Sequence, residues 1–117
     1  MKVISPKLHA ILDYLTVIFL IAAPKLFLLS DVATTFTYLL AGVHLLLTIC
    51  TNFKGGLFKV IPLPIHGLIE FFVALGLAAV AFTYFKHNVV EQTFFSCLGI
   101  VILIVFWLTD FKGNTAK

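Results

Sequence analysis

Charge is scarce in this chain of 117 residues. Only 11% of the residues are Asp, Glu, Lys or Arg, arginine is absent, and 62% are hydrophobic, with a mean hydropathy of +1.15. This composition leaves too little polar surface to cover a soluble globule of this size. The sequence therefore predicts a protein whose solvent is the lipid bilayer. The pI near 9.0 comes from lysines spread over the chain and does not indicate a nucleic-acid partner.

Known catalytic motifs are also missing. The chain has no glycine-rich phosphate loop, no nucleophile in a known motif and no metal-binding motif of known spacing, so we favour a protein that is not an enzyme and has no cofactor. The two cysteines, Cys50 and Cys97, fall at expected depths about 20 Å apart, which is too far for an intramolecular disulfide.

Four apolar stretches, at residues 8–29, 32–51, 64–85 and 91–107, dominate the chain instead. Each is close to the roughly 20 residues that an α-helix needs to cross the hydrocarbon layer. We therefore predict an all-α membrane protein, with four transmembrane helices in one bundle and a single transmembrane domain. A cleaved signal peptide is the alternative for the first stretch. It is disfavoured because that stretch is long, contains Asp13 and recurs as the third stretch.

The two halves of the chain repeat each other. Residues 9–14 (HAILDY) align with residues 66–71 (HGLIEF), and residues 51–55 (TNFKG) align with residues 109–113 (TDFKG). The period is about 58 residues, and such fixed-period similarity indicates an architecture built from repeats.

We assign the repeats to residues 1–57 and 58–117. Each repeat holds two spans, so both repeats should have the same orientation in the membrane and form parallel two-helix units. Six of the eight lysines fall on the side that holds both termini and the central connection, whereas Lys25 and Lys86 fall on the other side. By the positive-inside rule this bias places both termini in the cytoplasm.

Each repeat opens with a histidine four residues before a carboxylate, His9 with Asp13 and His66 with Glu70. Residues four apart share one face of a helix, so each histidine can pair with its own carboxylate. His44 on the second span falls in the same layer as the carboxylates, roughly 7 to 11 Å below the cytoplasmic surface. The other candidates are a tyrosine beside the first pair and polar residues where the even-numbered helices end: Tyr14, Thr51, Asn52, Thr109 and Asp110.

Two carboxylates inside a membrane need a reason, because each costs roughly 2.5 to 3.5 kcal/mol at a helix centre. One reason is structural: bonds to the histidines, or to the hydroxyls of Thr48, Thr51 and Thr109, fix helix packing and contribute about 0.6 to 2 kcal/mol each. A second is proton transfer. Burial favours the neutral acid and a neighbouring imidazolium favours the carboxylate, so a histidine–carboxylate pair can exchange a proton near neutral pH.

Two further alternatives involve a metal. Imidazoles and carboxylates from several helices can hold a divalent transition metal, with His44, Asp13 and Glu70 as the candidate ligands. A haem held by His44 and a second histidine is the other. It is disfavoured because His9 and His66 lie nearer the surface than His44, and ligation by two histidines needs matched depth.

The third span carries small residues at Ala74 and Ala78, where another helix can approach closely. We expect this face to pack inside the bundle, with a homo-oligomer or another membrane protein as the alternative partner. The lipid bilayer is the one partner that the composition requires.

The motifs PKLHAILDY at residues 6–14, IPLPIHGLIE at residues 61–70 and LTDF at residues 108–111 resemble the SPW-repeat family of small bacterial four-helix membrane proteins. The resemblance spans nearly the whole chain. It implies a multi-pass protein of the bacterial inner membrane and carries no established activity. The chain departs from the family in that the serine-proline-tryptophan signature survives only as Pro24 followed by Lys25.

From these observations we expect a polar site that opens to the cytoplasm and binds or relays a proton or a small cation. The alternative is a scaffold or assembly protein in which the same residues only fix helix packing. A metal- or haem-binding redox protein is a further alternative.

Overall fold

The computed structural model describes residues 2–112, and these form four helices and two short strands. The helices are α1 (Pro6–Leu26), α2 (Asp31–Ile49), α3 (Leu63–Phe82) and α4 (Val89–Leu108), and the strands are β1 (Thr51–Asn52) and β2 (Ile61–Pro62). All four helices are long and apolar enough to cross a membrane, which confirms the prediction of four such helices. The helix stop predicted at Gly113 lies outside the described residues.

Local signals account for where the helices begin. Pro6 occupies the first turn of α1, and the hydroxyl of Ser5 accepts a hydrogen bond from the backbone N–H of Leu8 at 3.2 Å. Ser30 caps α2 in the same way. Pro62 is the N-cap residue of α3, and Pro64 lies in its first turn.

Three predicted helix ends were wrong, and one of them is the end of the third span, which lies at Phe82 rather than at residue 85. The first span ends at Leu26 rather than at residue 29, because Leu28 adopts a left-handed φ of 52° in the turn before Ser30. The second span ends at Ile49 rather than at residue 51. The chain stops being helical there because β1 pairs in parallel with β2, with Thr51 opposite Ile61.

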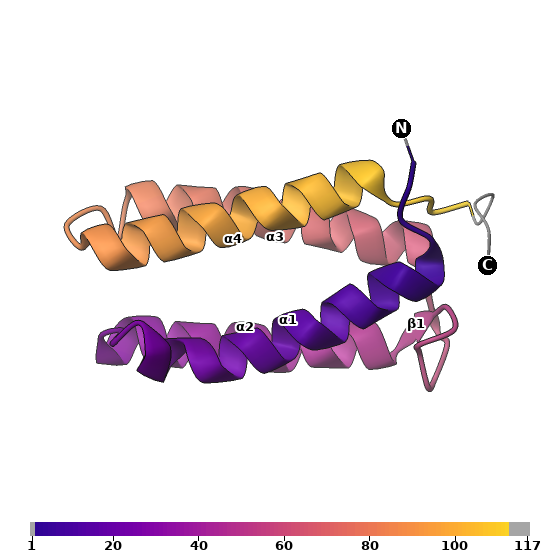
Figure 1. The fold of residues 1–117 in the computed structure, drawn as a ribbon, viewed down its shortest axis with the longest axis horizontal. Coiled ribbons are helices and arrows are strands. Elements are labelled where there is room, and N and C mark those ends of the chain that lie inside the picture. Colours follow the sequence, from indigo (N-terminus) through magenta and orange to yellow (C-terminus); the bar gives the residue numbers. More distant parts are fainter. Residues whose placement is uncertain (1, 113–117) are drawn as a thin grey trace.

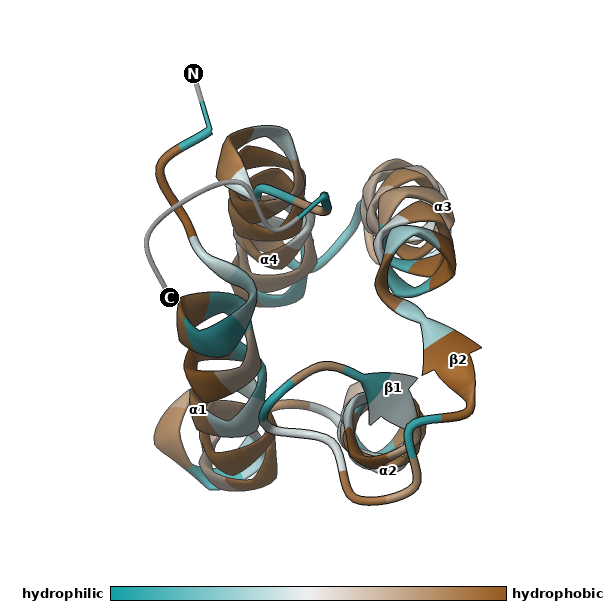
Figure 2. Ribbon diagram, turned by 90° about the vertical axis from the view of Figure 1, so that its right-hand side faces the viewer, coloured by the Kyte–Doolittle hydropathy of each residue, from teal (hydrophilic) through white to brown (hydrophobic). Residues whose placement is uncertain are grey.

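The molecule consists of two helical hairpins (Figure 1). α1 packs on α2 and α3 packs on α4, whereas contacts between the hairpins are sparser. The β1–β2 connection lies at one end of the molecule, and at that end Ile4 also bridges to Thr109. Viewed from this end, the four helices stand at the corners of a square, with α1 beside α4 and α2 beside α3 (Figure 2). We call this end the linker end.

The interior is apolar toward the far end and polar toward the linker end. A core cluster that includes Leu20, Leu77, Phe94 and Phe95 fills the far half of the bundle. Large apolar side chains cover the outside, as shown by Ile18, which is 64% exposed. An apolar exterior around buried ionisable groups is the arrangement that a lipid solvent favours.

Candidate functional site

Five ionisable side chains meet inside the bundle near the linker end. α1 supplies His9 and Asp13, α2 supplies His44, and α3 supplies His66 and Glu70. All five are buried: the two histidines that open the repeats are fully inaccessible, and His44 is the most exposed at 8%. By helical rise, the two carboxylates lie about 10 Å from the start of their helices. Asp13, Glu70 and His44 therefore face the bundle interior.

The closest histidine–carboxylate contacts join the two hairpins. His9 Nε2 lies 3.0 Å from Glu70 Oε1, and His66 Nε2 lies 3.0 Å from Asp13 Oδ2. The contacts within each helix are longer, at 3.3 Å for His9 with Asp13 and 3.4 Å for His66 with Glu70. The pairing predicted within each helix is therefore present, and each histidine also makes a shorter contact with the carboxylate of the other hairpin. The short contacts between the hairpins arise because α1 and α3 present these faces toward each other across the bundle.

His44 completes the cluster from one side only. Its Nε2 lies 3.5 Å from Asp13 Oδ1 and 3.8 Å from Glu70 Oε2. The corresponding position of the second repeat is Ile102, which lines a small cavity beside the same two carboxylates. The two histidine–carboxylate pairs across the bundle thus have matching geometry. His44 has no matching histidine, because Ile102 occupies the corresponding position.

Two threonines determine which nitrogen of each imidazole carries a hydrogen. The hydroxyl of Thr51 donates to the carbonyl of Leu47 at 2.6 Å, and its oxygen lies 2.6 Å from Nδ1 of His66. A hydroxyl has a single hydrogen, so once that hydrogen is donated to the carbonyl the oxygen can only accept from the imidazole. Nδ1 of His66 must therefore be the N–H donor, an assignment that follows from the network of bonds.

The second repeat has the same arrangement. The hydroxyl of Thr109 donates to the carbonyl of Val105, and its oxygen lies 2.8 Å from Nδ1 of His9. In both repeats the threonine belongs to the opposite half from its histidine. Both imidazoles are thus oriented with Nε2 toward the carboxylates.

A proton or a cation must sit between Nε2 and the carboxylates. With Nδ1 as the donor, Nε2 of a neutral imidazole is a lone pair, and a lone pair 3.0 Å from a carboxylate oxygen is repulsive. Either each pair holds one proton, on the nitrogen or on the oxygen, or a shared cation receives all these lone pairs. The cluster is therefore a buried polar site whose geometry is compatible either with shared protons or with a metal ion.

The spacing of the atoms resembles a coordination shell. When metal–ligand bonds are about 2.0 to 2.2 Å long, neighbouring ligand atoms lie about 2.8 to 3.6 Å apart in tetrahedral or octahedral geometry. Five of the six nitrogen–oxygen distances, between 3.0 and 3.5 Å, fall in that range. Within residues 2–112, Nε2 of His44 and Nε2 of His66 make no hydrogen bond of acceptable geometry, although both are buried. One ligand atom from each of His9, Asp13, His66 and Glu70 can be chosen so that all lie within 4.8 Å of one another.

A small cavity of about 20 Å³ adjoins Asp13, His44 and Glu70. This is room for roughly one water molecule. A porphyrin ring does not fit there, which disfavours the haem alternative.

The other candidate residues lie around the cluster. The Tyr14 hydroxyl donates to the carbonyl of Gly55 at 2.6 Å and ties α1 to the connection between the hairpins. Asn52 is exposed, whereas Asp110 is buried and its backbone N–H bonds to the carbonyl of Ile4. The hydroxyl of Thr48 donates chiefly to the carbonyl of His44 at 2.8 Å and is 3.5 Å from Asp13.

Sequence reasoning missed the role of the two threonines as histidine partners, and it missed a further buried acid, Glu91. Thr51 and Thr109 were expected to bond carboxylates, although their duplication at matching positions did mark them as important. Glu91 is 3% exposed and accepts a hydrogen bond from the backbone N–H of Ser30 at 2.6 Å, which joins the hairpins at the far end. Its position in the first turn of a helix gave no signal of that contact.

Comparison with known protein families, with curated proteins and with solved structures finds no match for this chain. The function is therefore argued from the chemistry of the site.

Proposed function

We propose that this chain is a membrane-embedded metal-binding protein in which the cluster of His9, Asp13, His44, His66 and Glu70 holds one divalent transition-metal ion. The observation that carries the proposal is the convergence of Nε2 lone pairs and carboxylate oxygens at 3.0 to 3.5 Å, with each Nδ1 of the paired histidines engaged by a threonine.

The ligand chemistry favours a transition metal over calcium or magnesium. Imidazole nitrogen together with carboxylate oxygen suits zinc, iron and their neighbours, whereas calcium and magnesium prefer sites made of oxygen alone. A ligating histidine normally donates its other ring N–H to a nearby acceptor, which fixes the ring and its tautomer. Thr51 and Thr109 occupy that supporting position here.

Charge balance supports the same proposal. Asp13 and Glu70 carry two negative charges when ionised, and a divalent ion cancels both. A neutral assembly avoids most of the penalty that separate charges incur in a medium of low dielectric constant. A scaffold that used these groups only for packing would gain about 0.6 to 2 kcal/mol from each bond and would not need their lone pairs to converge on one point.

Metal titration tests the proposal. The protein, purified in detergent and stripped with a chelator, is titrated with Co²⁺ while its visible spectrum is recorded, and Zn²⁺ is then added as a competitor. We expect binding of about one ion per chain, with Co²⁺ absorption bands that Zn²⁺ removes. Glu91→Gln, which alters the buried acid at the far end, should bind like the native protein. A native protein that binds neither ion would overturn the proposal and leave the scaffold alternative in place.

The two threonines give a positioning prediction. Thr51→Val and Thr109→Val keep the shape of the side chain and remove the acceptor for Nδ1, so each should weaken Co²⁺ binding by about 10- to 100-fold. Serine at either position should restore binding because it restores the hydroxyl. Thr37→Val is the matched control, since the Thr37 hydroxyl is equally buried and its hydrogen bond goes to the carbonyl of Ala33, on its own helix. Equal affinities for all these variants would show that the threonines do not position the ligands.

Orientation in the membrane is a separate part of the proposal. The lysines of the linker end, among them Lys7, Lys54 and Lys112, outnumber those of the far end, so the cluster should lie near the cytoplasmic face with both chain ends in the cytoplasm. A reporter active only in the periplasm should give no signal when fused after Lys117 and a strong signal when inserted after Leu28. The reverse pattern would contradict this topology.

A further inference from the structure

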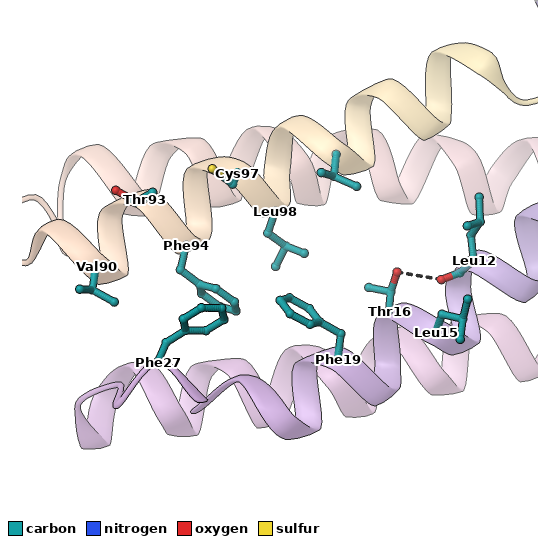
Figure 3. Close-up of a pocket in the computed structure, with 11 residues that line it drawn as sticks. Leu12, Leu15, Thr16, Phe19, Phe27, Val90, Thr93, Phe94, Cys97 and Leu98 are labelled. Carbon is teal, nitrogen blue, oxygen red and sulfur yellow. Dashed lines mark hydrogen bonds between the residues drawn. The ribbon is translucent and has the colours of Figure 1, made fainter. Parts of the chain in front are cut away.

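A long apolar groove runs between α1 and α4, on the side where the two hairpins meet. Its volume is about 540 Å³, within the range of pockets that hold small molecules. Figure 3 shows Phe19 and Leu98 facing each other across it, with the rings of Phe27 and Phe94 side by side farther along and Val90 beyond them. The hydroxyl of Thr16, which donates to the carbonyl of Leu12 at 2.8 Å, is one of its few polar groups.

The groove and the small cavity beside the metal-binding cluster are neighbours. Leu12, Thr16 and Val101 line both of them. The cavity in turn touches Asp13, His44 and Glu70. A molecule lying in the groove therefore has one end beside the cavity that adjoins the cluster.

The sizes of the two spaces restrict what such a molecule can be. The cavity, at about 20 Å³, takes roughly one oxygen atom, which is too little for a phosphate ester or a sugar. The groove extends from Thr16 to Phe27, about 16 Å along the helix, and its walls are almost entirely carbon. The shape matches one hydrocarbon chain that ends in a single small polar group.

Charge restricts the polar group further. With a divalent ion bound, the cluster is neutral overall, so a neutral oxygen can approach it without adding an uncompensated charge to a buried site. A hydroxyl or carbonyl oxygen meets this condition, whereas an ionised carboxylate does not. His44, with the longest contacts in the cluster, leaves the most room on the side of the cavity.

We propose that the α1–α4 groove binds a single-chain lipid with a neutral oxygen head, such as a long-chain alcohol or aldehyde, and that this oxygen reaches the metal at Asp13, His44 and Glu70. The contact of the lipid oxygen with the metal rests on the proposed function, whereas binding of the hydrocarbon chain depends only on the groove. The groove opens on the outer surface of α1 and α4, so the lipid enters sideways from the bilayer.

The test uses hexadecanol carrying a photoreactive diazirine near the end of its chain, with the full-length protein in nanodiscs. We expect label on the walls at the far part of the groove, at Phe27, Phe94 and their neighbours, that excess hexadecanol removes and excess phosphatidylcholine does not. In Co²⁺-loaded protein, hexadecanol should also change the visible spectrum, whereas hexadecane should not.

Two matched variants locate the binding. Val101 and Ile104 lie on α4 and are similarly exposed, at 53% and 52%, but only Val101 lines the groove and the cavity. Val101→Trp should reduce competable labelling by about tenfold or more and abolish the spectral change, with Co²⁺ binding retained. Ile104→Trp should leave all three measurements unchanged.

The outcomes separate this inference from the proposed function. If Co²⁺ binds but labelling is not competed by hexadecanol, or is competed equally by phosphatidylcholine, the groove is an ordinary lipid contact and this inference alone fails. If competed labelling persists in a protein that binds no metal, binding of the lipid chain in the groove is supported. The proposed contact between the lipid oxygen and a metal ion is then overturned. Equal labelling of the Val101→Trp and Ile104→Trp proteins would also overturn the assignment of the groove.

Discussion

The double variant Asp13→Asn, Glu70→Gln is expected to lose metal binding, with the affinity for Co²⁺ falling by more than about 100-fold. Changes to groups that only support ligands typically cost 10- to 100-fold, and this variant removes two ligands and both negative charges. The substitutions keep the size of each side chain, so they should lower the affinity for the metal ion more than the stability of the fold. Loss of the Co²⁺ absorption bands in detergent, with competition by Zn²⁺ as the measure of affinity, provides the test.

The single variant His44→Gln should have a smaller effect on Co²⁺ binding than the double variant. His44 has the longest contacts with the carboxylates, so its loss should weaken Co²⁺ binding less than the loss of Asp13 and Glu70. Thermal melting of each variant in the absence of metal separates a binding defect from a folding defect. If the double variant melts at a much lower temperature while the native protein binds no Co²⁺, the residues serve packing alone.

Metal affinity is expected to rise steeply with pH, by up to about 100-fold per pH unit, because binding releases about two protons. The count follows from the hydrogen bonds: without a metal, the His9–Glu70 pair and the His66–Asp13 pair each need one proton between nitrogen and oxygen. The ion must displace both protons. Lower pH therefore favours the protonated cluster and expels the metal, and higher pH favours the metal.

Calorimetric titration in two buffers with different ionisation enthalpies measures the protons released. The Glu91→Gln protein should release the same number as the native protein, since Glu91 lies at the far end of the bundle and bonds to a backbone N–H. A metal affinity that does not change with pH would show that the pairs are not protonated in the metal-free state. It would also contradict the tautomer inferred from Thr51 and Thr109.

Several features of the site could be predicted from the sequence because they depend on order along the chain. The alignment of residues 9–14 with residues 66–71 identified both histidine–carboxylate pairs, since a copied polar residue in an apolar span stands out. The depth of His44 was predictable because helical rise is constant, once the direction of the second span is known.

Other features could not be predicted, because they depend on how one half packs against the other. Nothing in the order of residues says that His9 pairs more closely with Glu70 than with Asp13, which is four residues away on the same helix. The same holds for Thr109, which bonds to a histidine one hundred positions earlier in the chain. The end of α2 was misplaced because pairing of Thr51 with Ile61 is a contact between segments that local patterns do not reveal.

The sequence by itself therefore determined four apolar helices and the identity of the ionisable residues, because composition, run length and helical periodicity are local properties. Tertiary structure alone decided the rest: that Nε2 atoms from α1, α2 and α3 converge on shared carboxylates, and that a groove between α1 and α4 adjoins them. The physical reason is that the local sequence of a helix does not fix how the helix is rotated about its own axis relative to its neighbours. Packing between the two hairpins sets that rotation, and with it the faces that meet.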